Sequence, residues 1–466
     1  MINIISYGAT QEVTGSCHIV EIDDKKIMID CGMFQGEEED KNAQKFEFNP
    51  SEIDYILITH AHLDHIGRIP KMVKKGFSGK IYATKPTMEL AYIILMDSAK
   101  IMNEDFNTKR RKAVRKAKEK LLKKPLYGPL DVEKTFNHTE WINPEYNTYY
   151  DLCEGISFRY KNAGHILGSA FIELSYIQNA KSRTIVFSGD IGNSNRLVLP
   201  DLQTCKKANT LYVESTYGDR EHHSIKSTIK EFKKVIINTL NKKGNVLIPS
   251  FAIERTQELL CILRDMHNKG ELPKCKIFLD SPMATRATDV YRNYSEELSG
   301  KCQHNIEDDG TVFNFSALVY TQTPEASKAI NEVKSRAIII AGSGMCNGGR
   351  ITHHFKHRIW NPKNAILFVG YQAKGTLGRE IIEGAEWINL YGEDIIVKAS
   401  IHTINGFSAH ADQKAIIRWI SKIKKLKNIF LIHGEAESQK AFKKALQEQI
   451  AIDTHIVKYK EKIVLK

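Results

Sequence analysis

The sequence lacks the features that would place the protein in a membrane or in an oxidising compartment. No apolar run approaches the roughly 20 residues that a membrane-spanning helix needs. Residues 1–10 contain no basic stretch followed by an apolar run, so they do not predict a signal peptide. None of the eight cysteines forms a C-x-x-C pair, and their scatter over 466 residues does not indicate a disulfide framework. We therefore expect a soluble, cytoplasmic protein without membrane contact.

Length and composition predict a globular protein of two or three domains, and the charge favours a polyanionic partner. The chain is longer than the ~100–200 residues of one domain, and 42% hydrophobic and 26% charged residues are ordinary values. The net charge of +12 favours polyanions by long-range attraction, although surface lysines are often merely solvated. Residues 109–124 hold ten Lys or Arg and one Glu. This run could follow a nucleic-acid backbone or be a solvated helix face.

The order of the predicted elements indicates one domain inserted into another. Strands dominate the first sixty residues, and a helix is expected over residues 86–124. After about Asp219, helices alternate with strands, as in βαβ units on a parallel sheet. From about Val397 the pattern that precedes Asp219 returns. The expected strands are Ile2–Ser6, His18–Ile22, 26–30, 55–59, 156–160, 170–176, 184–188, 246–248, 276–279, Ala337–Ala341, 365–369 and Asn428–Ile432, and the further helices are 225–240, 253–267 and 413–422.

One short motif predicts a metal site. His60-Ala-His62-Leu-Asp64-His65 follows an apolar strand and places four ligand-type side chains within six residues. Imidazole and carboxylate groups suit zinc. One loop cannot easily direct all four side chains at a single ion, so two neighbouring ions fit better, with His60 and His62 on one and Asp64 and His65 on the other.

Two ions would need more ligands than this motif supplies. Three candidates each follow a strand end and lie among small residues: His165 in Asn162-Ala-Gly-His-Ile-Leu-Gly-Ser169, Asp190 at the end of Thr184-Ile-Val-Phe-Ser-Gly-Asp190, and His410 in Gly406-Phe-Ser-Ala-His410. Taken singly, each could simply cap or brace a loop. Together with the first motif they would complete a site of five His and two Asp.

In this order the residues resemble the motifs of the metallo-β-lactamase superfamily, beginning with Asp30 in Met28-Ile-Asp-Cys-Gly32. Later tracts resemble the additional motifs of its β-CASP branch, which includes ribonuclease J and the nuclease subunit of the cleavage and polyadenylation specificity factor. These tracts are Val213-Glu-Ser-Thr-Tyr-Gly218, Gly406–His410, Leu431-Ile-His-Gly-Glu435, residues 248–260 and residues 342–350.

The resemblance implies an α/β fold: an αββα metallo-β-lactamase sandwich with an inserted α/β β-CASP cap domain. The sandwich would comprise residues 1–218 and 399–466, and the cap residues 219–398. Two Zn²⁺ per chain are implied. His60, His62 and His165 would hold one, Asp64, His65 and His410 the other, and Asp190 would bridge them.

The implied activity is a zinc-dependent ribonuclease in RNA processing or decay. A hydroxide activated by both zinc ions, at the interface of the two domains, would attack the phosphodiester bond. Asp64 belongs to the catalytic set, Asp30 would orient a ligating histidine, and Glu214 and His433 would be acid–base residues or would brace the metal loops. Phosphate or RNA contacts are expected from Ser343, Gly344, Gly348, Lys374, Gly375, Thr376, Arg255 and Arg350.

RNA, expected to be single-stranded, is preferred over DNA because the last motif carries a histidine, His433, as in RNA-acting members of the branch. A DNA nuclease, a non-catalytic RNA-binding subunit and a small-molecule metallohydrolase are the rival functions. Less than one zinc per chain would favour the binding subunit, and activity on a lactam or thioester alone would favour the last. The choice between endonuclease and 5′-exonuclease, the metal loaded in the cell and the oligomeric state, with a homodimer among the options, stay open.

Overall fold

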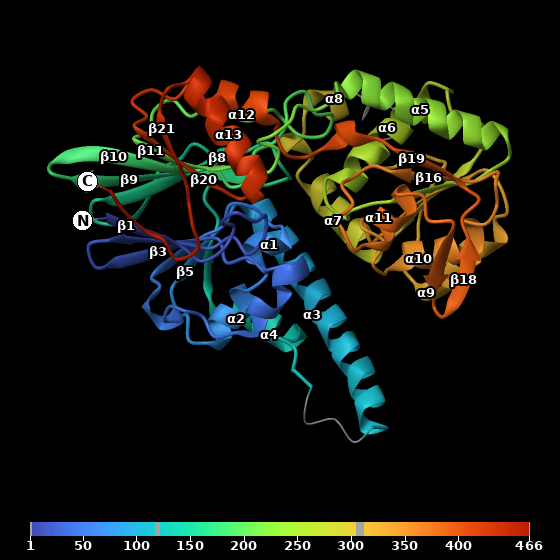
Figure 1. Cartoon of the computed structure of the whole chain (residues 1–466), viewed down its shortest axis with the longest axis horizontal. Helices are drawn as coiled ribbons and strands as arrows, with labels where there is room; N and C mark the ends of the chain where they lie inside the picture. Colours follow the sequence, from blue (N-terminus) through green and yellow to red (C-terminus); the bar gives the residue numbers. More distant parts are fainter. Residues whose placement is uncertain (1, 117–121, 304–311, 466) are drawn as a thin grey trace. The chain divides into compact units, whose positions relative to one another are not determined.

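The computed structural model describes residues 2–116, 122–303 and 312–465 and divides the chain into two compact units. The first unit comprises residues 1–194, 201–221 and 410–466, and the second comprises residues 195–200 and 222–409. The chain therefore leaves the first unit and returns to it, as expected for an insertion. Figure 1 shows both units, with labels on many of their helices and strands.

The first unit contains two seven-stranded sheets. One has the order β22-β1-β2-β3-β4-β5-β6, antiparallel from β22 to β3 and parallel from β3 to β6. Its strands are β1 (Ile2–Ser6), β2 (His18–Ile22), β3 (Lys25–Ile29), β4 (Tyr55–Leu57), β5 (Lys80–Tyr82), β6 (Glu140–Ile142) and β22 (Lys462–Leu465).

The second sheet has the order β21-β20-β11-β10-β9-β8-β7. Strands β10, β11, β20 and β21 run parallel, so their carboxyl ends meet at one edge. The strands are β7 (Tyr150–Cys153), β8 (Ile156–Asn162), β9 (Ala170–Gln178), β10 (Lys181–Phe187), β11 (Thr210–Glu214), β20 (Asn428–Ile432) and β21 (Asp453–Ile456).

Apolar side chains from both sheets form one core. Ile4 and Ile29 of the first sheet and Phe158 and Phe187 of the second are fully buried in the same cluster. The outer face of the second sheet packs against α12 and α13, where Trp419 joins a separate cluster. The helices of this unit are α1 (Leu63–Ile66), α2 (Ile69–Lys74), α3 (Lys85–Val114), α4 (Pro129–His138), α12 (Gln413–Ile420) and α13 (Ala436–Gln449). This arrangement confirms the predicted αββα sandwich.

The second unit is built on a six-stranded, fully parallel sheet of order β14-β13-β15-β12-β16-β19, as the alternating pattern predicts. The strands are β12 (Val246–Pro249), β13 (Lys276–Asp280), β14 (Leu318–Tyr320), β15 (Ala337–Ala341), β16 (Ala365–Phe368) and β19 (Ser400–Thr403), and β17 (Trp387–Leu390) and β18 (Glu393–Ile396) form a separate hairpin. The helices are α5 (Ile225–Asn241), α6 (Arg255–Asn268), α7 (Pro282–Asn293), α8 (Gly300–Gln303), α9 (Pro324–Ala329), α10 (Arg350–Arg358) and α11 (Leu377–Ile382).

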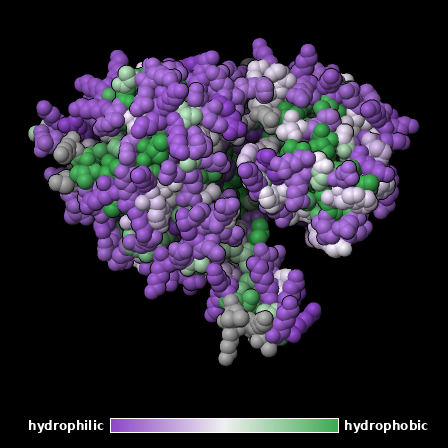
Figure 2. Space-filling model, in the orientation of Figure 1, coloured by the Kyte–Doolittle hydropathy of each residue, from purple (hydrophilic) through white to green (hydrophobic). Residues whose placement is uncertain are grey.

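The long helix α3 differs from its predicted extent. It ends at Val114, and residues 117–121 of the predicted helix and basic run lie outside the described residues. Its last buried residue is Ala99, and most of the residues that follow it in the helix are exposed. Figures 1 and 2 show this end projecting from the first unit, with mostly hydrophilic side chains. No helix within the described residues is long and apolar enough to cross a membrane.

Candidate metal centre

The predicted metal motif lies in the turn between β4 and α1. His62 is the N-cap of α1, which places Asp64 and His65 in its first turn. Backbone hydrogen bonds hold this turn: Ser16 N donates to the Asp64 carbonyl at 2.9 Å and Cys31 N to the His65 carbonyl at 2.8 Å. The neighbouring position 32 must be glycine, because a Cβ there would lie 1.5 Å from the Asp64 carbonyl oxygen.

Four donors form a first group at the carboxyl ends of the strands: His60, His62, His165 and Asp190. His62 Nδ1 lies 3.0 Å from His60 Nε2 and 3.1 Å from His165 Nε2. Asp190 Oδ2 lies 3.4 Å from His60 Nε2 and 3.5 Å from His165 Nε2. These are the three histidines that the resemblance assigns to one zinc, and the structure brings them together.

A second group comprises Asp64, His65 and His433. His433 Nε2 lies 3.3 Å from His65 Nε2 and 3.4 Å from Asp64 Oδ2. The other oxygen of Asp190, Oδ1, lies 3.3 Å from His65 Nε2. The two carboxylate oxygens of Asp190 thus face different groups, which is the placement that a bridging ligand requires.

His410 lies beside these groups, and His433 stands where the sequence analysis placed His410. Among the described residues, neither Asp64 nor His65 shares a donor group with His410. His410 Nδ1 instead lies 3.0 Å from Glu214 Oε2, and its Nε2 lies 3.9 Å from Asp190 Oδ2. A carboxylate on one ring nitrogen leaves the other nitrogen to face Asp190, so the ligand role of His410 stays a prediction.

The predicted supporting carboxylates contact the histidines directly. Asp30 Oδ2 lies 2.7 Å from His65 Nδ1, and Asp30 also accepts from Thr59 N and Thr59 Oγ1, both at 2.8 Å. Asp30 has a left-handed backbone with φ of 59°, which is uncommon for a non-glycine residue and occurs often at functional sites. Sequence reasoning missed Thr59, although it directly precedes the motif.

Glu214 connects two loops of the site. Its carboxylate accepts from Ile191 N, from Thr216 Oγ1 at 2.7 Å and contacts His410. Thr216 Oγ1 lies 3.1 Å from His433 Nδ1, so this hydroxyl links Glu214 to His433, and both residues also belong to a third donor group with Asp190. His433 also has a left-handed backbone, with φ of 49°. Thr216 was missed as well, and its position two residues after Glu214 in the same motif is the signal that could have found it.

Burial and charge divide the histidines into two kinds. Burial lowers the pKa of His60 to about 3 and that of His62 to about 4, so both rings are neutral near pH 7. Burial acts the same way on His65 and His410, but carboxylates outweigh it there. Asp190 and Asp30 raise the pKa of His65 well above its usual value, and Glu214 and Asp190 raise the pKa of His410 to about 9.

These residues fit a metal ion. Neutral imidazoles each offer one lone pair, and His62 Nδ1 lies within hydrogen-bond distance of two other ring nitrogens that it cannot both satisfy. A cation accepts several such lone pairs at once, and nitrogen with carboxylate oxygen is the donor set that suits zinc. His60 and His165 are fully buried, so the geometry is fixed by the surrounding core.

The predicted phosphate loops lie together in the second unit. The loop of residues 342–349 follows β15, and the loop of residues 370–376 follows β16. Gln372 Nε2 donates to the Gly344 carbonyl at 2.9 Å, and Leu377 N donates to Asn347 Oδ1 at 3.3 Å. Ser343 Oγ contacts the Gly348 carbonyl at 3.3 Å. The structure therefore joins the two loops into one surface.

Within this surface, the residues from 374 to 376 differ in exposure. Lys374 and Gly375 are exposed, whereas Thr376 is buried and caps α11 by accepting from Arg379 N at 3.2 Å. The two predicted arginines have internal partners. Arg255 Nη1 donates to Glu258 Oε2, and Arg350 Nη1 donates to Asp280 Oδ1, each at 2.7 Å.

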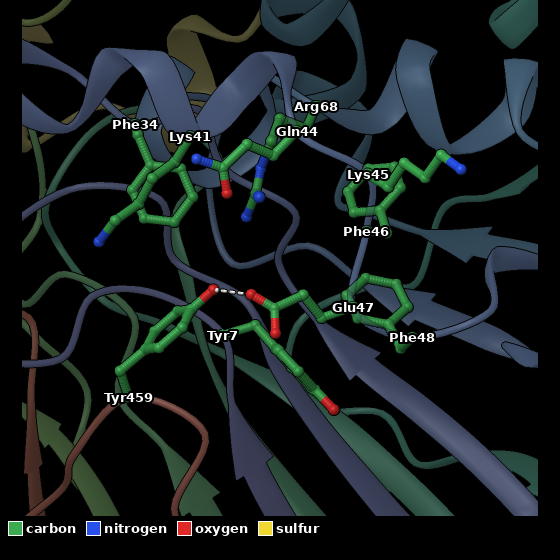
Figure 3. A pocket seen from close by; sticks show the side chains of 10 residues that line it. All are labelled: Tyr7, Phe34, Lys41, Gln44, Lys45, Phe46, Glu47, Phe48, Arg68 and Tyr459. Atoms are coloured by element: carbon green, nitrogen blue, oxygen red, sulfur yellow. Dashed lines mark hydrogen bonds between the residues drawn. The ribbon is translucent and has the colours of Figure 1, made fainter.

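A small pocket in the first unit is lined in part by Tyr7, which begins a loop that contacts His433. Figure 3 shows its aromatic and basic side chains, with the Tyr459 hydroxyl donating to Glu47 Oε1 at 2.9 Å. Arg68 lines the pocket and donates to the Gly15 carbonyl at 3.3 Å. Gly15 ends the loop of residues 7–15, in which the Ala9 carbonyl accepts from His433 N at 2.7 Å.

Comparisons with known proteins agree with this geometry. Residues 10–140 match the metallo-beta-lactamase superfamily, residues 256–381 the Beta-Casp domain, and residues 394–457 the Zn-dependent metallo-hydrolase RNA specificity domain. The fold and the donor groups define a metallo-hydrolase of the metallo-β-lactamase superfamily. Within that superfamily, the chain belongs to the β-CASP family.

Relatives match along almost the whole chain. Ribonuclease TTHA0252 of Thermus thermophilus is 39% identical over 95% of both chains. Transcription termination factor FttA of Methanococcus maripaludis is 32% identical over 96% of this chain and 70% of its own length. A crystal structure of a protein of unknown function from Enterococcus faecalis V583 covers all of both chains with a TM-score of 0.55 and 12% identity, which shows the fold alone.

Proposed function

We propose that this protein is a zinc-dependent ribonuclease that hydrolyses phosphodiester bonds of single-stranded RNA, using two zinc ions. The observation that carries the proposal is Asp190, whose two oxygens face two separate groups of buried donors. The similarity to ribonuclease TTHA0252 and the match to an RNA specificity domain support RNA as the substrate.

His60, His62 and His165 would hold one ion, Asp64, His65 and His410 the other, and Asp190 would lie between them. When bound, paired zinc ions activate water and offset negative charge on a phosphoryl group. Asp30 would keep the N–H of His65 on Nδ1 so that Nε2 is available as a ligand. His433 would protonate the leaving oxygen, with its ring oriented by Thr216.

The inserted β-CASP domain, which we place at residues 219–398 between 1–218 and 399–466, would bind the RNA backbone. Glycine N–H groups of the loop of residues 342–349 and the exposed Lys374 suit phosphate oxygens. Arg350 would act through its ion pair with Asp280, which holds the start of α10 directly after this loop. Arg255 pairs with Glu258 within α6 and stays a predicted phosphate contact.

A time course on a 5′-labelled single-stranded RNA and the matching DNA tests the proposal. Protein of measured zinc content is compared with Asp64→Ala. We expect the wild type to cleave RNA only, and Asp64→Ala to cleave neither strand. Internal fragments would identify an endonuclease and released mononucleotides a 5′-exonuclease. Cleavage of DNA alone, or no cleavage of either strand at two zinc ions per chain, would overturn the proposal.

A further inference from the structure

Phe251 is an exposed aromatic residue at the carboxyl edge of the second unit's sheet. It follows β12 by two residues, and 43% of its surface is exposed. Strand β12 lies between β15 and β16, so Phe251 lies between the loops of residues 342–349 and 370–376. In open parallel sheets, ligands bind beyond the carboxyl ends of the strands.

Two glycines accommodate the ring. A Cβ at Gly344 would lie 2.7 Å from the Phe251 ring, and a Cβ at Gly370 would lie 3.5 Å from it. The ring therefore packs against the glycine loop at a distance that a side chain at position 344 would not allow. This contact explains why position 344 is a glycine, whether or not the loop binds phosphate.

The backbone beneath the ring is fixed. The Phe251 carbonyl accepts from Thr256 Oγ1 at 2.7 Å and from Ser250 Oγ at 3.1 Å. The ring is thus held in place on one side and open to solvent on the other. Holding an aromatic ring in position before a ligand arrives reduces the entropy lost on binding.

The neighbouring residues suit a nucleotide. Tyr371, directly after Gly370, is 52% exposed, and Lys374 is exposed in the same loop. Single exposed apolar residues are common on proteins and need no function. Here, however, an exposed ring, a second exposed aromatic, an exposed cation and glycine N–H groups share one edge. Aromatic platforms beside basic groups bind single-stranded nucleic acid with little sequence preference.

We infer that Phe251 is a stacking platform for one base of the bound RNA. The inference rests on the proposed ribonuclease function, and it names a contact to a base where the phosphate loops would contact only the backbone. Since every base has a π-face, this contact would position RNA without selecting its sequence.

The test uses Phe251→Leu, Phe251→Trp and a series of RNA oligonucleotides that each carry one abasic position. Binding, by fluorescence anisotropy, and cleavage are measured in parallel. Stacking of one base contributes to the free energy of binding, and its loss should raise Kd by about 5- to 100-fold. We expect the wild type to show this loss at one abasic position. Phe251→Leu should bind intact RNA as weakly as the wild type binds the RNA with that abasic position, and it should lose no further affinity there. Phe251→Trp should restore binding.

Trp360→Leu is the matched control, because Trp360 is 50% exposed in the same unit but precedes β16 at the amino edge of the sheet. Each variant must unfold at the same temperature as the wild type and bind the same amount of zinc. Identical abasic profiles for the wild type and Phe251→Leu would overturn the inference. Because binding is read separately, a protein that fails to cleave RNA would overturn the proposed function without deciding the role of Phe251.

Discussion

The carboxyl ends of the strands carry the candidate sites in both units, yet the two sites are built in opposite ways. In the first unit, His60, His165 and Asp190 are buried, and hydrogen bonds from several loops fix them. In the second unit, Phe251 and Lys374 are exposed at the edge of a sheet. Bond cleavage needs donors held rigidly away from water, whereas binding a long polymer needs groups that remain open to it.

Burial explains how the first site can hold two of its histidines, His60 and His62, neutral. Desolvation disfavours the charged ring, and this lowers the pKa of His60 and His62 to about 3 and about 4. Lys374 of the second unit is exposed instead, so its side chain is open to phosphate groups in solution. The contrast predicts that variants of the first unit change turnover and variants of the second change affinity.

The largest effect is expected from His62→Ala. Removing a ring that contacts both His60 and His165 should abolish turnover and lower zinc content while most of the fold remains. Turnover on labelled RNA, zinc per chain and circular dichroism check this. His455→Ala is the control, because His455, which lies on β21, pairs with Glu461 and belongs to no donor group among the described residues. Near-normal turnover of His62→Ala would refute the site.

Smaller effects are expected from alanine variants of His410 and His433, and they distinguish a zinc ligand from a general acid. We expect His410→Ala to lose about one zinc per chain, because a carboxylate on one ring nitrogen is typical of a metal-ligating histidine. His433→Ala should keep both ions and slow turnover by about 10²- to 10⁴-fold, the usual contribution of a general acid. Zinc stoichiometry of both variants is the measurement. Loss of zinc from His433→Ala alone would make His433 the ligand, as the group with Asp64 and His65 suggests.

Local sequence patterns predicted most of the fold and the His60–His65 motif, the family resemblance grouped His165 with His60 and His62, and long-range contacts explain what both missed. The His60–His65 motif is local, so its spacing alone indicates a metal site. The position of His433 beside His65 depends on contacts between residues 368 positions apart. Phe251 lies in the tract of residues 248–260, but the sequence assigned no role to its side chain, and only the packed structure places it against Gly344.

A third variant sharpens the comparison within the second unit. In Gly344→Ala the new Cβ would lie 2.7 Å from the Phe251 ring, so the ring must move, whereas in Gly370→Ala the 3.5 Å distance is ordinary contact. We expect Gly344→Ala to raise KM for RNA several-fold, with unchanged zinc content, and Gly370→Ala to behave as the wild type. Equal KM values for the two variants would show that the position of the ring does not affect RNA binding.

The smallest effect is expected at the end of α3, which belongs to the first unit but is exposed, as Phe251 and Lys374 of the second unit are. Lys109, Arg110, Arg111 and Lys112 lie beyond the last buried residue of this helix. If they contact RNA phosphates, changing all four to Gln should reduce the salt dependence of binding. On single-stranded RNA, the slope of log Kd against log salt should fall by about 0.7 for each phosphate that these side chains neutralise.

The control removes the same charge elsewhere: Lys242, Lys243, Lys269 and Lys274 are exposed and precede β12 or β13, at the amino edge of the second unit's sheet. Changing these four to Gln lowers the net charge equally but should leave the slope near that of the wild type. Equal slopes for both quadruple variants would mean that the basic run acts only through net charge. A lower slope for the α3 variant alone, with turnover on a short oligonucleotide unchanged, would place RNA contacts on a segment that takes no part in bond cleavage. In both units, exposed side chains would then bind RNA. The buried donors of the first unit would form the separate site of bond cleavage.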